Sequence, residues 1–461
     1  MSTNQSLRAA VVPLFMLACL LLGGSTGAAW PNMALQLGAI GILAWAAMSA
    51  LRMQAGLPER NLVRLCYAMV ALVLVQLIPL PPAIWSMLPG REMVVRGFAL
   101  LGQPLPWLPL SLTPYDTMAS ALWLLPPLAI IAAILRVGAY RELWLSIALG
   151  LAAFAGVLLG VLQVTSANVF DSPWYLYAIT NNGMATGFFA NSNHMATLLI
   201  VTIPFMVALL GVKRRGRRLV QQEAGRYAIL GGALLVLLVG LALNPSTAGF
   251  GLGIAVLAAS LLIRSPISGR LARWGMVAVI LLAIAAVIAV FATPLESRIA
   301  AAGADQSVST RATSFSTSLR ALSDTFPAGS GSGSFNSIYP AYEDPDRIDR
   351  YYVNHVHNDY IELVLETGLA GLLLILIFLL WWLGRAIAIW RAPIIDHFAR
   401  AATIASAAML AHSLVDFPLR TSAIAAVFAM TVALMAGPRR REKVAKVSSQ
   451  GEQGARHLSI G

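Results

Sequence analysis

The sequence predicts an all-α polytopic membrane protein with about twelve transmembrane helices. Hydrophobic residues make up 58% of the 461 residues and charged residues only 11%. Apolar runs of about 20 residues recur along the chain, and this is the length that crosses the hydrocarbon core of a bilayer. We expect one transmembrane domain over residues 1–437, with spans near residues 9–24, 33–51, 62–85, 118–135, 143–164, 188–212, 228–243, 248–263, 274–293, 361–383, 399–414 and 421–435.

Basic residues indicate how these spans are oriented, because short cytoplasmic loops retain Lys and Arg. If twelve spans alternate from a cytoplasmic N-terminus, 24 of the 32 basic residues fall in the cytoplasm and 14 of the 20 acids fall on the other side. Both termini are therefore expected in the cytoplasm. The net charge of +12 follows from this bias and from anchoring against anionic lipid, and it does not require nucleic acid as a partner.

The two ends of the chain need separate interpretation. Arg8 and the apolar run after it imitate a secretory signal, but a second apolar run follows closely, so we expect a retained first span. Residues 438–461 are polar and basic, and a disordered cytoplasmic tail is expected there. Cys19 and Cys66 both fall in predicted spans, which argues against a disulfide framework and against a cysteine metal site.

Two loops on the non-cytoplasmic side interrupt the apolar pattern. The smaller loop, residues 86–116, is rich in proline, and Trp85 and Trp107 are expected as interfacial anchors. The larger loop, residues 294–360, has helix and turn signals of its own, and a loop of that length is usually functional or disordered. These signals favour a functional role for the larger loop.

Two histidines stand where the larger loop enters an apolar run. His355 and His357 precede the run over residues 363–383, so water and hydrocarbon meet near their imidazoles. Histidine titrates near neutral pH and accepts a proton from a hydroxyl, which suggests acid-base chemistry at the membrane surface. A histidine at a helix entrance is also often a simple interfacial polar group, and spacing alone leaves both interpretations open.

Further motifs accompany the histidines. Residues 187–196 open an apolar run with Gly-Phe-Phe-Ala-Asn-Ser-Asn-His-Met-Ala, and residues 412–419 close one with His-Ser-Leu-Val-Asp-Phe-Pro-Leu. Between them lie a helical stretch led by Arg311, a glycine-rich turn over residues 329–335 and the His357-Asn358 pair.

This order of motifs resembles the O-antigen ligase and Wzy-type polymerase superfamily over residues 187–419, about half of the chain. The resemblance implies a glycosyltransferase with a GT-C-like fold in a bacterial inner membrane. It implies transfer of a glycan from undecaprenyl diphosphate to an acceptor at the periplasmic face, without a metal or another cofactor. The acceptor would be lipid A core for a ligase, a further lipid-linked glycan for a polymerase, or a protein.

The resemblance also assigns roles to residues. Transfer from a sugar diphosphate needs a base for the acceptor hydroxyl and positive charge for the departing diphosphate. His357 matches the family's histidine before asparagine and is expected as the base, while His355 orients it, accepts the proton instead or contacts the diphosphate. Arg311 and Arg320 are expected to bind the diphosphate, since a guanidinium grips phosphate oxygens at two points.

One position departs from the family pattern. Family members carry an arginine in the turn between the two spans that follow the basic cytoplasmic loop, whereas this chain has Thr247 there. If that arginine holds the diphosphate, this chain must use another cation or bind the donor differently. The alternative cations are Arg298, Arg320, Arg350 and Arg420.

The polar residues of the flanking motifs are candidates for a substrate cavity. Asn191, Asn193 and His194 either line this cavity or cap the sixth span. His412 and Asp416 are four residues apart, so they are expected to pair on one helix face beside the same cavity.

Three other features favour structural roles. Asp359 and Glu362 have the spacing of a capping box. The glycines of residues 329–333 lack the strand and the lysine of a phosphate-binding loop, so a flexible turn is expected. The acids of residues 343–349 lack the spacing of a calcium loop, so a solvated or sugar-contacting loop is expected.

A transporter or flippase of lipid-linked saccharides is the second function class that such a chain would suit. Transporters usually show repeated halves and ionisable groups near the bilayer midplane. In this chain the charges gather in the loops, with most of the acids in the non-cytoplasmic ones, and the interiors of the predicted spans are almost uncharged. Glycan transfer is therefore favoured.

Overall fold

The computed structural model describes residues 3–49, 56–211, 220–265, 306–345 and 353–437, and part of the segment 274–288. Helices dominate these ranges, and the one sheet found there pairs two residues with two residues. This composition confirms the prediction of an all-α polytopic membrane protein. The C-terminal tail lies outside the described residues.

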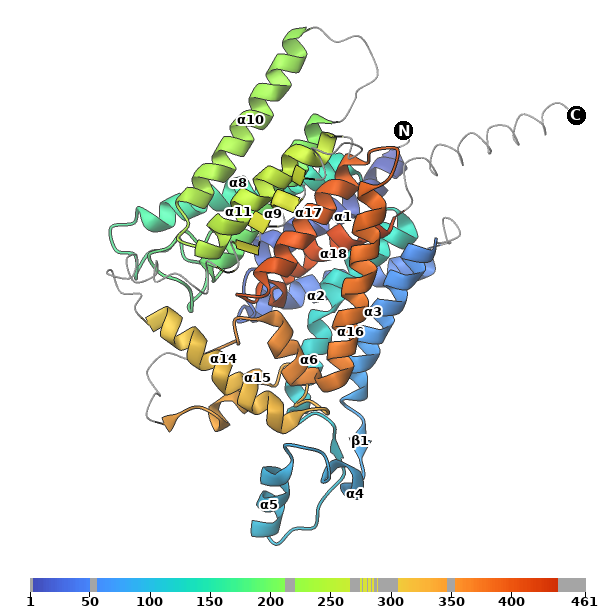
Figure 1. Cartoon of the computed structure of the whole chain (residues 1–461), viewed down its shortest axis with the longest axis vertical. Coiled ribbons are helices and arrows are strands. Elements are labelled where there is room, and N and C mark those ends of the chain that lie inside the picture. Colours follow the sequence, from blue (N-terminus) through green and yellow to red (C-terminus); the bar gives the residue numbers. More distant parts are fainter. Residues whose placement is uncertain are drawn as a thin grey trace, which may run out of the picture.

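Long apolar helices form the body of the molecule (Figure 1). Within the described residues, eight helices are long and apolar enough to cross a membrane. They are α1 (Thr3–Leu22), α2 (Ala29–Met48), α6 (Pro114–Trp123) continued by α7 (Leu125–Ala132) and η1 (Ala133–Val137), α8 (Glu142–Val164), α9 (Ser192–Leu210), α10 (Val220–Ala242), α11 (Thr247–Leu261) continued by η2 (Leu262–Arg264), and α16 (Asp359–Trp390). Three further helices are α3 (Leu57–Val75), α17 (His397–His412) and α18 (Ser422–Ala436). Eleven of the twelve predicted spans correspond to these helices. The remaining predicted span, residues 274–293, lies mostly outside the described ranges.

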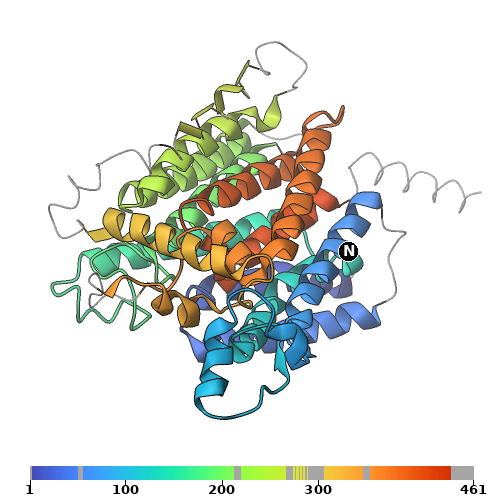
Figure 2. The ribbon, with the colours of Figure 1, turned by 60° about the horizontal axis from the view of Figure 1, so that its bottom comes forward.

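The third predicted span is too long at its C-terminal end. Prediction placed it over residues 62–85, but α3 ends at Val75 because a proline-rich segment follows, and proline removes the N–H that a helix needs. The chain instead forms a small subdomain that projects beyond the long helices (Figures 1 and 2). Its elements are β1 (Pro79–Leu80), α4 (Pro82–Trp85), α5 (Glu92–Leu100) and β2 (Leu108–Pro109), with β1 and β2 antiparallel.

The two tryptophans of this subdomain differ in their surroundings. Trp107 is 65% exposed, whereas Trp85 is 1% exposed. The indole Nε1 of Trp85 donates a hydrogen bond to the carbonyl oxygen of Pro106, 2.8 Å away. The prediction that Trp85 is an interfacial anchor is therefore wrong, because the subdomain folds around this side chain.

Helix α9 lies at the centre of the bundle. Of the residues in its most apolar 18-residue segment, 89% are buried, whereas the corresponding share in α10 is 22%. A helix that is apolar all round is one that packs on every side, and α9 contacts α8, α10, α11 and α17. α17 also packs against α18, so these two helices and α9 form the inner layer that carries the site residues.

Two arginines at helix ends, Arg385 and Arg400, are buried. Arg385 donates from Nε to the carbonyl oxygen of Met435, 2.9 Å away, at the end of α18. Arg400 donates from Nη1 to the carbonyl oxygens of Ile263 and Ser265, at 3.1 and 2.7 Å. Both side chains therefore satisfy carbonyl groups that have no partner inside their own helix.

The larger loop is mainly helical where it is described. It contains α14 (Gln306–Thr325), α15 (Phe335–Ile338) and η4 (Tyr339–Ala341). Buried side chains of this loop, among them Phe335, Tyr339 and Val356, pack together with Leu365 of α16 in a second hydrophobic core. The loop is thus a packed layer over one end of the bundle.

The glycine-rich turn of the larger loop is also packed rather than flexible. Its glycines at 329, 331 and 333 all have positive φ, as a tight turn requires. Ser330 and Gly331 donate their backbone N–H groups to the carbonyl oxygens of Leu365 and Glu366, at 3.0 and 2.8 Å. The turn is confirmed, but these bonds fix it against α16.

Helix α16 bends where it meets this turn. Gly368 has φ 61° and ψ −145°, and a Cβ at this position would overlap the carbonyl oxygen of Pro327. Only glycine allows that approach. The bend separates a short polar segment, which carries Glu362 and Glu366, from the long apolar segment that follows.

Candidate functional site

Three imidazoles surround the buried ring of Phe417. The ring centroid of His355 lies 4.2 Å from that of Phe417, and those of His194 and His357 each lie 5.0 Å away. His194 comes from the first turn of α9, the other two histidines from the loop before α16, and Phe417 from the turn after α17. The fold therefore joins three motifs that are distant in the sequence, and we call these four residues the Phe417 cluster.

His357 has the geometry of a general base. Its Nδ1 lies 3.2 Å from Oδ1 of Asp416, so a proton on Nδ1 leaves the lone pair on Nε2 for a substrate hydroxyl. The His357 side chain is 25% exposed while that of Asp416 is 1% exposed. Within the described residues His357 is the only non-glycine residue with positive φ, at 58°. Such strained backbone is often found at functional sites.

The carboxyl group of Asp416 is held in its charged form. Burial raises its pKa, but the hydrogen bond from His357 and the neighbouring imidazoles of His194 and His412 outweigh burial and bring the pKa below its ordinary value. Oδ1 also accepts the backbone N–H of Phe417 at 2.9 Å. The carboxylate can therefore orient the His357 ring and stabilise the imidazolium that forms on proton transfer.

His412, the predicted partner of Asp416, is its electrostatic neighbour, but the side-chain hydrogen bond that the structure shows for Asp416 is to His357. Nδ1 of His412 lies 2.8 Å from the hydroxyl of Thr197 on α9, whereas Asp416 forms its hydrogen bond with His357. The last regular residue of α17 is His412, and the backbone N–H of Asp416 donates to the carbonyl oxygen of His412 at 3.0 Å, so Asp416 lies one turn beyond it.

A second carboxylate–imidazole pair lies beside the first. Nδ1 of His355 is 2.7 Å from Oε1 of Glu362, which is fully buried. The capping box expected from Asp359 and Glu362 is wrong, because Asn358 is the N-cap of α16 and its side chain accepts two backbone N–H groups. This frees Glu362 to hold His355.

Arg420 binds three carboxylates of α16. Its Nη1 lies 3.0 Å from Glu366, its Nη2 3.5 Å from Glu362 and its Nε 3.6 Å from Asp359. Burial lowers the pKa of Arg420, but the three carboxylates outweigh burial and raise it above its ordinary value. The charge of this guanidinium is already compensated, which argues against Arg420 as the replacement for the arginine missing at Thr247.

The two arginines expected at the diphosphate both belong to α14. The backbone of Arg311 is helical, and its side chain is outside what the structure describes, as are Arg298 and Arg350. Arg320 is exposed and donates from Nη2 to the carbonyl oxygen of Tyr342 at 2.8 Å. Among the described contacts of Arg320, none reaches the Phe417 cluster, so diphosphate binding by these arginines stays a prediction.

The first turn of α9 combines capping with a contribution to the cluster. Asn191 is the N-cap, and its Oδ1 accepts the backbone N–H of Asn193 at 2.8 Å. His194 follows and is buried with its ring at right angles to that of Phe417. Capping is thus the observed role of Asn191, whereas His194 faces the candidate base.

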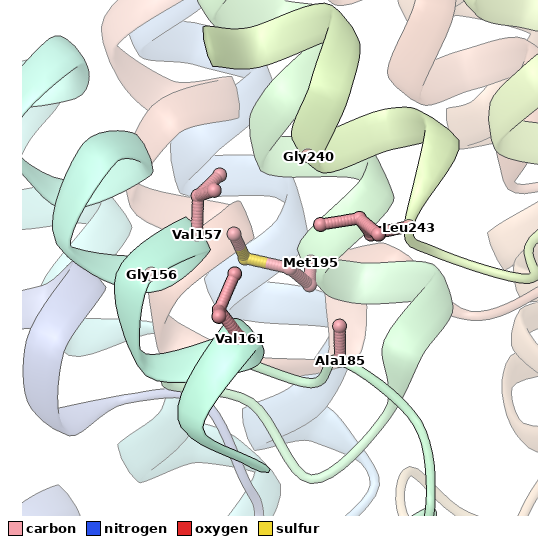
Figure 3. Close-up of a pocket in the computed structure, with 7 residues that line it drawn as sticks. All are labelled: Gly156, Val157, Val161, Ala185, Met195, Gly240 and Leu243. Atoms are coloured by element: carbon pink, nitrogen blue, oxygen red, sulfur yellow. The ribbon is translucent and has the colours of Figure 1, made fainter. Parts of the chain in front are cut away.

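An apolar hollow adjoins the same turn of α9. It has a volume of about 210 Å³, open space included, and is lined by α8, α9, α10 and the segment before α9. Figure 3 shows Val157, Met195 and Leu243 pointing toward one another across it. Met195 directly follows His194, so one helical turn places a hydrocarbon-lined space next to the polar cluster.

Residues 232–376 match the protein-family model described as O-antigen ligase. Over these residues the chain is similar to O-antigen ligases. The match confirms the resemblance inferred from the motifs, and the matched region includes His355 and His357 but not Asp416. No curated protein matches the chain.

The family consists of membrane ligases and polymerases. The match supports an enzyme role in polysaccharide biosynthesis, and the long apolar helices support a multi-pass membrane protein. This assignment fits a site in which a polar cluster and an apolar hollow are neighbours.

Two residues of this region, Phe417 and Glu366, were not predicted. Phe417 is adjacent to Asp416 and Glu366 lies within the motif after His357, which is the signal that the sequence offers. Phe417 is distant in the sequence from the three histidines that it contacts, and Glu366 is distant from Arg420. Periodicity therefore gives no reason to connect them.

Proposed function

We propose that this protein transfers a glycan from undecaprenyl diphosphate to an acceptor hydroxyl at the periplasmic face of the bacterial inner membrane. The observation that carries the proposal is the contact of His357 with Asp416, which leaves Nε2 directed to a substrate. The acceptor is lipid A core, a growing glycan or a protein.

In this proposal Nε2 of His357 takes the proton of the acceptor hydroxyl. The hydroxyl oxygen then bonds to the anomeric carbon, and the bond from that carbon to the donor diphosphate breaks, with the electron pair leaving on the diphosphate. Asp416 stabilises the imidazolium, and Glu362 positions His355 beside it.

Metal-independent transfer is tested with purified protein, lipid-linked oligosaccharide and acceptor. We expect turnover to continue in a chelator and without nucleoside triphosphate, because the diphosphate donor already contains its leaving group. Strict dependence on a divalent ion would contradict the proposed chemistry. Movement of the lipid-linked glycan across vesicles without transfer would favour the transporter.

The proposed topology places α14 in the periplasm and the C-terminal end of α16 in the cytoplasm. In a background without Cys19 and Cys66, a cysteine at the exposed position Ser316 should react with a membrane-impermeant thiol reagent added to the periplasm. A cysteine at the exposed position Arg391 should react only after the membrane is opened. The reverse labelling pattern would exclude transfer at the periplasmic face.

A further inference from the structure

Residues 165–191 join α8 to α9 and form a third polar segment outside the long helices. Figures 1 and 2 show this segment beyond the ends of α8 and α9, on the side of the molecule that carries α14. We call it the α8–α9 loop. No role has been assigned to it so far.

Buried hydrogen bonds fix the α8–α9 loop to the end of α8. Oε1 of Gln163, a fully buried residue, accepts the backbone N–H groups of Thr186 and Gly187, both at 2.9 Å. Its Nε2 donates to the carbonyl oxygens of Trp174 and Gly187, at 3.1 and 3.0 Å. One glutamine thus joins the two halves of the loop, which gives the loop a defined shape.

The inner edge of the loop is continuous with the candidate site. Asn181 accepts the backbone N–H of Ser192 through Oδ1 at 3.0 Å, and its own N–H donates to the carbonyl oxygen of Ala190 at 3.0 Å. Ser192 is two residues before His194, which packs against Phe417. A chain bound along the loop would therefore lead to the Phe417 cluster.

The outer face of the loop carries aromatic, aliphatic and polar side chains, Ile179 and Leu176 among them, and is almost uncharged. Phe170 is 78% exposed and Trp174 44% exposed, and the side-chain amide of Asn182 is also in an exposed position. Asp171 is the one charged residue of the loop sequence. A surface without Lys or Arg lacks the cations that recognise phosphate groups. Aromatic faces and amide groups instead suit the apolar faces and hydroxyls of sugars.

We propose that the α8–α9 loop binds the glycan chain of a substrate, with Phe170 and Trp174 packing against sugar rings. This inference rests on the proposed glycan transfer and adds to it the surface that holds the chain next to the base. The glycan belongs to the donor or to the acceptor, and the kinetic test below separates these two sources.

The test uses the full-length protein in lipid nanodiscs and the double variant Phe170→Ala/Trp174→Ala. We expect KM for the substrate whose glycan binds the loop to rise about tenfold, with kcat unchanged, because neither side chain belongs to the Phe417 cluster. KM for the other substrate should stay the same. Trp174→Tyr keeps an aromatic face and should restore most of the affinity.

Trp107→Ala is the matched control, since Trp107 is an exposed tryptophan of a separate subdomain. It should leave both KM values unchanged. If the double variant transfers glycan with both KM values of the wild type, the loop is not a glycan surface, and a lower thermal stability in nanodiscs would then identify an aromatic belt at the membrane interface. If the wild-type protein transfers no glycan at all, the proposed function fails together with this inference.

Discussion

His357→Ala is expected to lower the transfer rate by about a hundredfold or more, as is typical when a general base is removed. The protein should still fold and insert, because the His357 side chain is part of no hydrophobic core and is 25% exposed. His357→Asn is a useful second variant. Asparagine adopts positive φ more readily than most residues, so it keeps the backbone at 58° while removing the base.

Asp416→Asn should show the same defect in a milder form. An amide keeps the shape of the carboxylate but neither selects the Nδ1–H form of His357 nor stabilises the imidazolium. Thr197→Val is a matched control, because it removes the hydrogen bond to His412 and leaves the contact between His357 and Asp416 intact. Its rate should stay within a few fold of the wild type.

The measurement is the rate at saturating donor and acceptor, with thermal unfolding of each variant as the check on folding. His355→Ala should fall between His357→Ala and the wild type, since His355 is held by Glu362 and lies beside the same Phe417 ring. Full activity in well-folded His357→Asn would remove the proposed base. If Arg311→Ala were fully active as well, the transporter would become the better explanation.

The sequence predicted the membrane helices well because their signal is local. Length and absence of charge define each span, and these properties do not depend on the rest of the fold. Errors arose where local signals conflict with packing. The end of α3 lies ten residues before the predicted end, since the prolines of the next segment remain compatible with an apolar run but not with a continuing helix.

The candidate site shows the same limit more sharply. His357 was found because it stands directly before a helix start, next to Asn358. Asp416 was found as well, but as a neighbour of His412, since a spacing of four residues suggests a helical pair, whereas its side-chain hydrogen bond to His357 comes from the tertiary fold. Contacts between distant segments are decided by packing, which spacing does not record.

Arg420→Met is expected to destabilise the protein by about 3–5 kcal/mol, the usual result when one partner of a buried ion pair is removed. Without the guanidinium, Asp359, Glu362 and Glu366 would face one another with no cation among the contacts seen here. Methionine fills a similar volume, so the loss would come from charge and not from a cavity. Arg420→Lys should be intermediate, because one ammonium cannot reach all three carboxylates in the directions of a guanidinium.

Arg320→Met provides the matched control for this prediction. Arg320 is exposed and its described hydrogen bond is to one carbonyl oxygen, so the change in stability should stay within about 0.5 kcal/mol. Thermal unfolding in nanodiscs, together with KM for the donor, separates the two roles of Arg420. If Arg420→Met unfolds like the wild type but has a much higher KM for the donor, Arg420 binds the diphosphate and is the cation that replaces the family arginine. If Arg420→Met unfolds at a lower temperature, as we expect, the three carboxylates explain why this partly buried arginine is held at the start of α16. The diphosphate must then be bound elsewhere, and Arg311 is the first residue to test.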